Sequence, residues 1–222
     1  MEWPAQTLPR GFDVALAAVA LVLLGPVLLA IGLAVVLTSG RPMLYGQTRL
    51  GRNGVPFRIH KFRTLEVGSD EDDTVAPDGD PRTTPVGGWL RRSRLDELPQ
   101  LWDVLRGRMA LVGPRPETAA NLAGVDAQAL ERRLSVRPGL TGATQLAFIA
   151  EDELLADEAN PTQIYREVLV PAKVRNDIAW LKTRTRAGDL ALLLRTPMVL
   201  ASPGLRMQSR RRVSALLRGT VG

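Results

Sequence analysis

Two adjacent carboxylates, Asp96 and Glu97, stand in the stretch RLDELPQLWDVLRG and are well suited to chemistry. Arg91, Arg92 and Arg94 crowd the approach to this pair. Carboxylates beside several cations suit a metal ion and an anionic, phosphorylated substrate, and an Asp whose pKa the cations lower could act as a nucleophile. The alternative is an ordinary helix start, in which Asp96 caps the helix and Glu97 complements its dipole.

Two further arginines lie in rigid turns. Arg115 stands between Pro114 and Pro116 in LVGPRPE, and Arg137 opens RPGLTG. Proline restricts the backbone on both sides of such a residue, and a guanidinium held in place can bind a phosphate through two hydrogen bonds. Both turns therefore favour phosphate recognition.

The composition narrows the chemistry further. The chain has no Cys, which excludes disulfides, thiolate nucleophiles and Cys-ligated zinc. His60 is the only histidine, so a Ser-His-Asp triad would have to include it. The net charge of +6 suits nucleic acid, anionic lipid or a phosphorylated substrate, but only 5% of the residues are aromatic. Because single-stranded nucleic acid is commonly bound by stacking on aromatics, lipid and phosphate are favoured and no nucleic acid is expected.

Residues Val14–Leu37 form an uncharged apolar segment, about as long as a bilayer-crossing helix. A signal peptide has a shorter apolar core, and a buried soluble helix normally has a polar face, so membrane insertion is favoured over both. Basic residues are frequent after the segment, whereas Arg10 alone lies close before it. The positive-inside rule therefore places the following side in the cytoplasm.

Gly25-Pro26 lies near the centre of this apolar segment. Proline removes one helical hydrogen bond and clashes with the preceding turn, which predicts a kink at Pro26. Two topologies fit: a bent helix that spans the membrane, or a re-entrant helix-break-helix that returns to the side it came from. Hydropathy does not decide between them.

Residues Met43–Leu65 predict a β-hairpin, with Asn53-Gly54 suited to a type I′ turn. Lys61 and Arg63 lie at the end of the second strand. A solvated basic edge strand explains these cations, and so does a pair of cations directed at phosphate. On the residues alone, the solvated edge strand is favoured.

Residues Glu66–Pro85 are acidic and rich in Pro, Gly and Thr, which indicates a solvated loop that could act as a lid. The EF-hand pattern fails here, because Thr74 and Ala76 occupy a ligand position and the glycine position. Pro203–Gly222 is a basic tail, which could lie on anionic lipid or be disordered. Helices are expected at Val86–Arg92, from Asp96 to Gly107 with Pro99 in the first turn, within Glu151–Asn160, at Pro171–Arg184 and at Asp189–Leu200.

Several of these stretches, in this order, resemble the bacterial sugar transferase family, the monotopic phosphoglycosyl transferases that prime surface-glycan synthesis. The matching stretches are Lys61–Thr64, Leu95–Gly107, Leu111–Glu117, Arg137–Gly142 and Pro171–Asp177. Each is a weak signal alone, but together and in order they are highly specific. The resemblance extends from about Leu8 to Leu200.

The resemblance implies an α/β, mostly helical fold in a monotopic membrane protein. Residues 1–40 would form a membrane-inserted re-entrant helix, broken near Pro26. Residues 41–205 would form a catalytic domain on the cytoplasmic face of the bacterial inner membrane, with a small β-hairpin or sheet and amphipathic helices at an anionic lipid bilayer. Residues 206–222 would form a basic C-terminal tail.

The resemblance also implies a mechanism. Asp96 would attack the β-phosphate of a nucleotide sugar, with UDP favoured, and form an aspartyl phosphosugar. Polyprenol phosphate, here undecaprenyl phosphate, would then take the sugar phosphate and initiate exopolysaccharide or other glycoconjugate synthesis. Glu97 would help to hold Mg²⁺, which neutralises the diphosphate oxygens.

Further substrate-binding residues follow from position and chemistry beside the resemblance. Phosphate contacts are expected from Lys61, Arg63 and Arg91. Contacts to the nucleotide or the prenyl phosphate are expected from Arg115, with Pro114 and Pro116 around it, and from Arg137. Asp177 matches a recurring acidic position of the family.

Two alternative functions stay open on the sequence. One is a Mg²⁺-dependent membrane phosphohydrolase that uses the same residues but releases free sugar phosphate. The other is a membrane-anchored binding protein, without catalysis, whose Asp96-Glu97 pair is only a helix cap. The sequence fixes neither the sugar nor whether the chain forms a homodimer.

Overall fold

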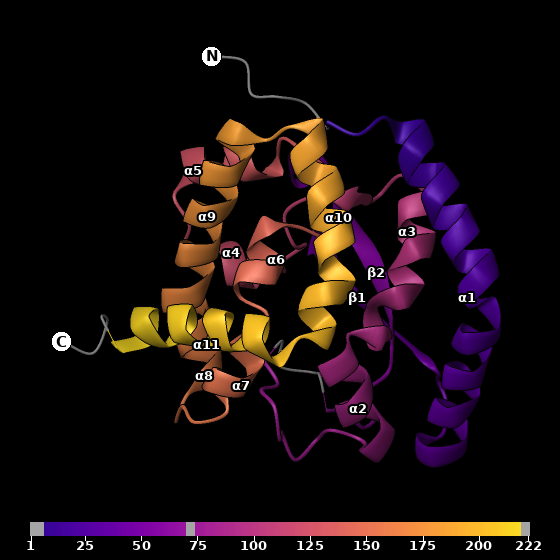
Figure 1. Ribbon diagram of the computed structural model, residues 1–222. Helices are drawn as coiled ribbons and strands as arrows, with labels where there is room; N and C mark the ends of the chain where they lie inside the picture. The colour runs from indigo at the N-terminus through magenta and orange to yellow at the C-terminus, as the bar shows by residue number, and fades with distance from the viewer. Residues whose placement is uncertain (1–6, 70–73, 219–222) are drawn as a thin grey trace.

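The computed structural model describes residues 7–69 and 74–218. Helices predominate, with four short strands among the described residues, as predicted (Figure 1). The helices are α1 (Arg10–Ser39), α2 (Pro85–Ser93), α3 (Leu101–Leu105), α4 (Ala119–Leu122), α5 (Ala127–Leu134), α6 (Ala143–Ala147), α7 (Glu151–Leu155), α8 (Pro161–Ile164), α9 (Val170–Thr183), α10 (Arg186–Ala201) and α11 (Pro203–Arg218). The strands are β1 (Leu44–Leu50), β2 (Pro56–Phe62), β3 (Ala110–Val112) and β4 (Gly139–Thr141).

Helix α1 runs along one edge of the molecule and bends near its middle (Figure 1). It continues without interruption over 30 residues, with Pro26 inside it. Many of its apolar side chains are exposed, and Val22, Leu29 and Leu37 are each at least 75% exposed. By length and composition, α1 is able to cross a membrane. The expected kink is thus a bend, and the re-entrant break stays a prediction.

The other side of α1 is fixed to the rest of the chain. Near its start, the buried carboxylate of Asp13 accepts a hydrogen bond from the backbone N–H of Leu111 at 3.2 Å. Near its end, Ile31 packs in one apolar cluster with Phe62 and Leu90. The apolar helix therefore has one face against the globular part and one face free for an apolar solvent.

The predicted hairpin is confirmed as an antiparallel pair of β1 and β2, in the register Leu44↔Phe62 to Leu50↔Pro56. At its tip Asn53 and Gly54 both adopt positive φ, 57° and 74°, and Val55 N–H donates to the carbonyl of Arg52 at 3.2 Å. Both central residues at positive φ are what a type I′ turn requires. The register delivers Lys61 and Phe62 beside α2 and α3.

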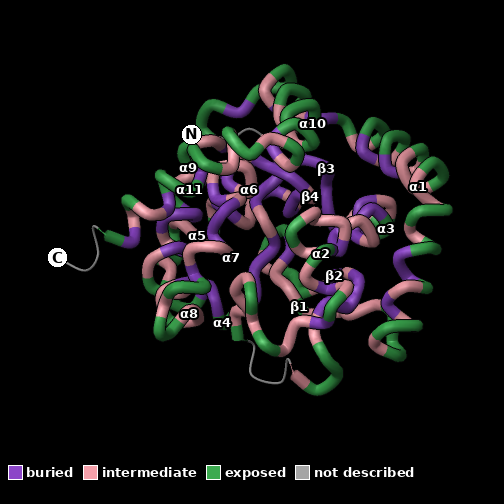
Figure 2. The backbone as a smooth tube through the Cα atoms, turned by 60° about the horizontal axis from the view of Figure 1, so that its bottom comes forward, coloured by how far each residue is buried: buried purple, intermediate pink, exposed green. Residues whose placement is uncertain are grey.

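A second pair, β3 and β4, is parallel and lies in the interior, where the tube in Figure 2 is largely purple. Gly113 directly follows β3 and Gly139 begins β4, and the backbones of these two glycines nearly touch. A Cβ atom on Gly139 would lie 2.0 Å from the backbone nitrogen of Gly113. Only glycine fits this approach, which brings the Pro-Arg-Pro turn against the Arg-Pro-Gly turn.

The C-terminal third, in its described part, consists of helices joined by short turns and loops. Helix α11 was expected as a separate basic tail, free or on lipid, but it packs against the domain: Val213 is fully buried and Leu217 is 9% exposed. Both join the apolar cluster that contains Leu169 and Val174. The expectation of a separate tail is thus wrong for the residues up to 218, because the apolar positions of α11 bury on one side while its arginines stay outside.

Candidate active site

The Asp96-Glu97 pair lies in a tight 3₁₀ turn, Leu95–Gln100, between α2 and α3. Arg94 ends α2 in the left-handed conformation with φ 58°, and the α-helix starts again only at Leu101. The expected α-helix beginning at Asp96 is therefore wrong, and so is the helix cap, since no side-chain cap hydrogen bond is made at this turn.

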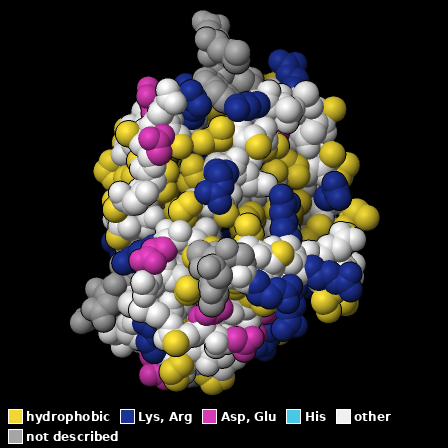
Figure 3. Space-filling model, turned by 90° about the vertical axis from the view of Figure 1, so that its left-hand side faces the viewer, with side chains coloured by type: hydrophobic (Ala, Val, Ile, Leu, Met, Phe, Trp, Pro, Cys, Tyr) yellow, Lys and Arg dark blue, Asp and Glu magenta, His cyan; other side chains and the backbone are white. Residues whose placement is uncertain are grey.

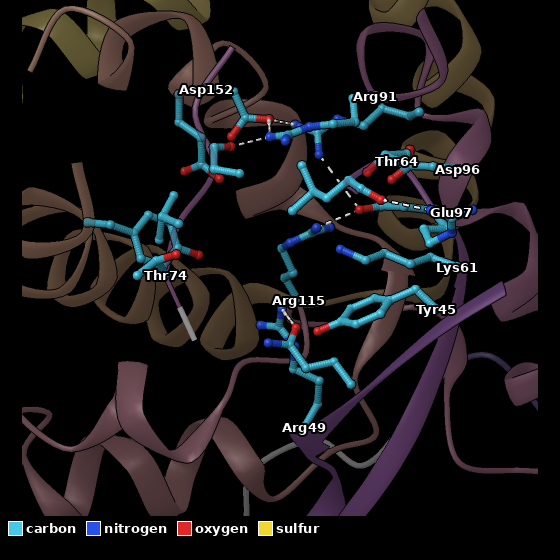
Figure 4. A pocket seen from close by; sticks show the side chains of 18 of the residues that line it. Tyr45, Arg49, Lys61, Thr64, Thr74, Arg91, Asp96, Glu97, Arg115 and Asp152 are labelled. Atoms are coloured by element: carbon cyan, nitrogen blue, oxygen red, sulfur yellow. Dashed lines mark hydrogen bonds and ion pairs between the residues drawn. The ribbon is translucent and has the colours of Figure 1, made fainter. Parts of the chain in front are cut away.

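The pair opens into a cavity of about 150 Å³, shown in Figure 4. The cavity lies where β1, β2, α2 and the 3₁₀ turn meet the Pro-Arg-Pro turn and the acidic loop. Side chains of both charge signs line it. They include Arg49, Lys61, Arg91, Arg94, Asp96, Glu97, Arg115, Glu151, Asp152 and Tyr165.

Asp96 is only 6% exposed, and its Oδ1 atom is buried without a hydrogen-bond partner among the described residues. Burial and the neighbouring charge of Glu97 raise the pKa of Asp96 to about 6, against the pull of Lys61 and Arg94. The expected lowering of this pKa is wrong, because burial disfavours the carboxylate more than the cations favour it. A partly desolvated carboxylate with an unpaired oxygen is available to react.

Glu97 differs sharply from its neighbour. Its Oε1 atom accepts a hydrogen bond from Arg115 at 2.5 Å and lies 3.7 Å from Arg94. Burial alone would raise the pKa of Glu97, but Arg115 and Arg94 outweigh it and lower this pKa to about 2. Glu97 is therefore ionised at every physiological pH and holds Arg115 beside Asp96.

Lys61 reaches the cavity from β2 and lies next to Tyr45, with Nζ 5.0 Å from the ring centroid (Figure 4). Burial lowers the pKa of Lys61 to about 8, although Asp96 opposes the shift. The structure thus favours Lys61 as a cation directed at phosphate over Lys61 as a solvated residue of an edge strand. A buried ammonium that faces a carboxylate is a good place for a phosphate oxygen.

Arg91 and Asp152 lie on another side of the cavity than Lys61 and Tyr45 (Figure 4), and Arg94 also lines it. Arg94 lies 3.5 Å from Asp152, and Arg91 donates to the carbonyl of Ala76. Residues Thr74–Ala76 of the acidic loop line the same cavity, as a lid would. Arg91 and Arg94 thus both line the cavity, and the phosphate contact expected of Arg91 stays a prediction.

Arg63 lines the cavity but its hydrogen bonds serve α1. Its guanidinium donates to the carbonyls of Ser39, Gly40 and Pro42 at 2.6–2.8 Å, at the C-terminal end of that helix. A cation there satisfies the last carbonyls and complements the helix dipole. The structure therefore makes Arg63 a cap of the apolar helix, in place of the expected phosphate contact.

Two further expected substrate-binding residues do not line this cavity. Arg137 donates through Nε to the carbonyl of Gly107 at 3.0 Å, beyond the end of α3. Asp177 is buried in α9, where it accepts hydrogen bonds from Arg133 at 2.8 Å and from Thr144. Both are positioned to hold the fold, since each ties together segments far apart in the sequence.

The Pro-Arg-Pro turn does hold its arginine at the site, as predicted. The carbonyls of Pro114 and Arg115 accept hydrogen bonds from the Gly139 backbone and from the Arg133 side chain. Arg49 donates to the Pro116 carbonyl at 3.4 Å. Pro114 and Pro116 thus fix the turn through backbone hydrogen bonds. Of the three residues, only Arg115 lines the cavity.

A buried polar chain behind Arg115 was not predicted. Tyr165 donates to Glu117 at 2.7 Å, and Lys173 donates to Tyr165 at 3.0 Å and to Glu151 at 2.6 Å. Burial would raise the pKa of Glu117, but Lys173 and Arg49 lower it to about 2. Two signals existed in the sequence: Glu117 closes the Gly-Pro-Arg-Pro-Glu stretch, and Lys173 stands in the stretch matched around Asp177.

The carboxylates can be tested for fit to Mg²⁺. Among the described residues, no group of three or more His, Cys, Asp or Glu side chains is placed to hold a metal alone. Mg²⁺, however, is usually bound through one or two carboxylates together with water and substrate phosphates. The unpaired Oδ1 of Asp96, beside the ionised Glu97, fits that mode. The donor set suits the ion when a phosphorylated substrate supplies the other oxygens.

Comparison with known proteins shows the family to which the chain belongs. The model of the family described as bacterial sugar transferase matches residues 4–203. The chain belongs to this family.

Named relatives of the chain act on nucleotide sugars and a lipid phosphate. It is 45% identical over 143 residues to the UDP-glucose:undecaprenyl-phosphate glucose-1-phosphate transferase of Escherichia coli K12. It is 40% identical over 190 residues to the protein of the same name from Caulobacter vibrioides. It is 34% identical over 190 residues to a UDP-N-acetylgalactosamine-undecaprenyl-phosphate N-acetylgalactosaminephosphotransferase of Aeromonas hydrophila.

The aligned regions differ in how much of each protein they cover. They take up 63% of this chain and 31% of the E. coli protein, and 84% of this chain and 67% of the Caulobacter protein. For the Aeromonas protein the shares are 84% and 42%. The family match, residues 4–203, contains the 3₁₀ turn Leu95–Gln100 and all the residues that line the cavity.

Proposed function

We propose that the chain transfers a sugar 1-phosphate from a UDP-sugar to polyprenol phosphate, through a covalent intermediate on Asp96. One observation carries this proposal: a buried Asp96 with an unpaired oxygen lies in a cavity whose wall also holds Lys61, Arg91, Arg94 and Arg115. The names of the relatives support a UDP-sugar donor and undecaprenyl phosphate as acceptor, in exopolysaccharide synthesis.

In the first step, an oxygen of the Asp96 carboxylate attacks the β-phosphorus of the UDP-sugar. The new bond joins Asp96 to phosphorus, the bond from this phosphorus to the bridging oxygen breaks, and UMP leaves. In the second step, a phosphate oxygen of the polyprenol phosphate attacks the same phosphorus, and Asp96 leaves as a carboxylate. The products are UMP and a polyprenyl diphosphate sugar, and the enzyme is restored.

The cavity cations support charge development in both steps. Lys61, Arg94 and Arg115 surround the pair, so they are placed to bind the oxygens of a diphosphate. Glu97 holds Arg115 in place through its 2.5 Å hydrogen bond. Mg²⁺, held by Asp96 and Glu97, would neutralise phosphate charge when bound.

Membrane attachment fits an acceptor with a long apolar chain. The exposed face of α1 and the exposed Leu194 and Met198 of α10 offer apolar surface. Figure 3 shows Lys and Arg side chains among hydrophobic ones on one side of the molecule. We place α1 in the bacterial inner membrane as a re-entrant helix and the cavity on the cytoplasmic face. The test is labelling of single cysteines introduced before and after α1: labelling from opposite sides contradicts the re-entrant form.

The catalytic proposal is tested by mass spectrometry of the enzyme after incubation with UDP-glucose or UDP-N-acetylgalactosamine and no acceptor. The expected result is one sugar phosphate on Asp96 and about one UMP released per enzyme. Asp96→Asn should give neither, while Asp157→Asn, an exposed control, should behave as the wild type. UMP release without an adduct, with free sugar phosphate formed, would favour the phosphohydrolase instead.

A further inference from the structure

A second, narrower cavity of about 60 Å³ adjoins the first. The two cavities share the lining residues Arg94, Glu97, Arg115 and Glu151. The ion pair of Glu97 and Arg115 is therefore reached from two openings. Asp96 lines only the first cavity, one residue away from the shared wall.

The two cavities differ in chemistry. The first is lined mainly by charged and polar side chains. Away from the shared wall, the second is lined by five apolar side chains, Leu140, Leu146, Phe148, Ile149 and Leu200, together with the polar Thr141, Thr144, Gln145, Lys173 and Thr196. A cationic end and an apolar body suit an amphiphile with an anionic head, and not a nucleotide.

The apolar end of the second cavity leads to the surface. Leu200, near the end of α10, also lines an open groove of about 360 Å³ with Trp89, Arg92, Pro203 and Arg206. Trp89 is 53% exposed. Leu200 thus lines both this groove and the second cavity, whose lining also includes Glu97 and Arg115. An exposed Trp beside arginines is a common feature of surfaces that meet lipid headgroups.

We infer that the second cavity is the acceptor route: polyprenol phosphate enters along Leu200, with its phosphate toward Arg94 and Arg115, while the UDP-sugar occupies the first cavity. This inference rests on the proposed function and names the acceptor's own opening within the same site. The shared wall then brings the acceptor phosphate next to the phosphorus carried by Asp96. A nucleophilic phosphate oxygen forms the new O–P bond there, and the Asp96 O–P bond breaks. Because displacement at phosphorus is in line, the acceptor oxygen takes the position opposite the Asp96 O–P bond that UMP has left, although the two substrates enter through different openings.

The experiment separates the two half-reactions. Leu200→Trp narrows the second cavity, and Ile149→Trp narrows it independently. Val55→Trp is the matched control, because Val55 is 63% exposed at the hairpin tip and lines none of these cavities. Each variant is assayed for the UMP burst without acceptor, and for steady turnover with undecaprenyl phosphate in detergent.

We expect both cavity variants to keep a burst of about one UMP per enzyme and to lose at least tenfold in turnover with acceptor, with a raised KM for it. The retained burst shows that each variant is folded. Equal slowing of burst and turnover in both variants, or slowing in neither, overturns the acceptor route. Absence of a burst in the wild type contradicts the proposed function itself, which is a different outcome.

Discussion

At the junction of α9 and α10, Arg184 and Asp189 are fully buried and bind each other at 2.8–3.2 Å. Arg184 also donates to the Val112 carbonyl at 2.9 Å, and Thr7 donates to Asp189. In the catalytic cavity, by contrast, the buried Asp96 keeps an oxygen without a partner. Both regions bury charge, but both carboxylate oxygens of Asp189 accept hydrogen bonds, whereas one oxygen of Asp96 accepts none from the described residues.

This contrast shows where charge holds the fold and where it is kept for a ligand. A buried ion pair whose carboxylate oxygens are both hydrogen-bonded, as at Asp189, fixes one arrangement of helices. The cavity lining has six cationic side chains against four carboxylic acids, so positive charge remains for phosphates. An unpaired buried carboxylate costs free energy unless a substrate or metal ion meets it. The predictions below test this division, from the largest expected effect to the smallest.

Asp96→Asn should abolish transfer, with a loss of about four orders of magnitude or more in turnover, as for other covalent nucleophiles. The fold should persist, because Asn needs no compensation for a buried charge, and the unfolding midpoint should be unchanged or higher. UMP release and thermal unfolding in detergent check both. Substantial turnover by this variant would remove Asp96 as the nucleophile.

Asp189→Asn should have the opposite profile, because it leaves the Arg184 charge buried and unpaired. We expect a loss of about 3–5 kcal/mol in the free energy of unfolding, measured by denaturant titration. The double variant Arg184→Met with Asp189→Leu should recover much of this loss. No loss in the single variant would show that the pair is not needed for the fold.

The two proline-flanked arginines, Arg115 and Arg137, offer a matched pair. Arg115→Lys removes the planar fork beside Glu97 and should lower kcat/KM by roughly 100-fold. Arg137→Lys loses the hydrogen bond to Gly107 and should cost about 1 kcal/mol of stability, with kcat/KM nearly unchanged. Equal kinetic losses in the two variants would place both arginines at the substrate.

These two arginines also show which features of the site could be predicted from the sequence. The apolar helix, the hairpin with its Asn-Gly turn and the Asp-Glu pair are local patterns, and each was predictable. Arg115 and Arg137 have similar neighbours in the sequence. Which guanidinium lines the cavity depends on how the two turns pack, with Gly113 against Gly139. Long-range packing of this kind leaves no signal in a single sequence.

The same limit explains three other corrections. Arg63 was expected at phosphate, but the carbonyls at the end of α1 lie 23 or 24 residues away in the chain and take up its hydrogen bonds. Asp177 was expected at the substrate, but Arg133, 44 residues away, binds it. The Asp96 pKa was expected low, since the cations nearby are visible in the sequence while burial is not.

The last comparison is between the two titrating groups that face each other, Asp96 and Lys61. With pKa values of about 6 and about 8, the carboxylate and the ammonium are both charged only between these values. Because Asp96 must be ionised to attack, kcat/KM for the UDP-sugar should fall about tenfold per pH unit below 6. It should fall again above 8, as Lys61 loses the charge that holds phosphate.

Lys61→Arg separates the two limbs of this profile. Arginine stays protonated at every pH of the assay, so the alkaline limb should disappear while the acid limb remains near 6. The measurement is the initial rate of UMP release at low UDP-sugar concentration between pH 5 and 9, since kcat/KM reports the free enzyme. An alkaline limb that persists in Lys61→Arg would assign it to a group other than Lys61. Because the charge at this position is kept at acid pH, an acid limb that moves with the substitution would assign that limb to a group other than Asp96.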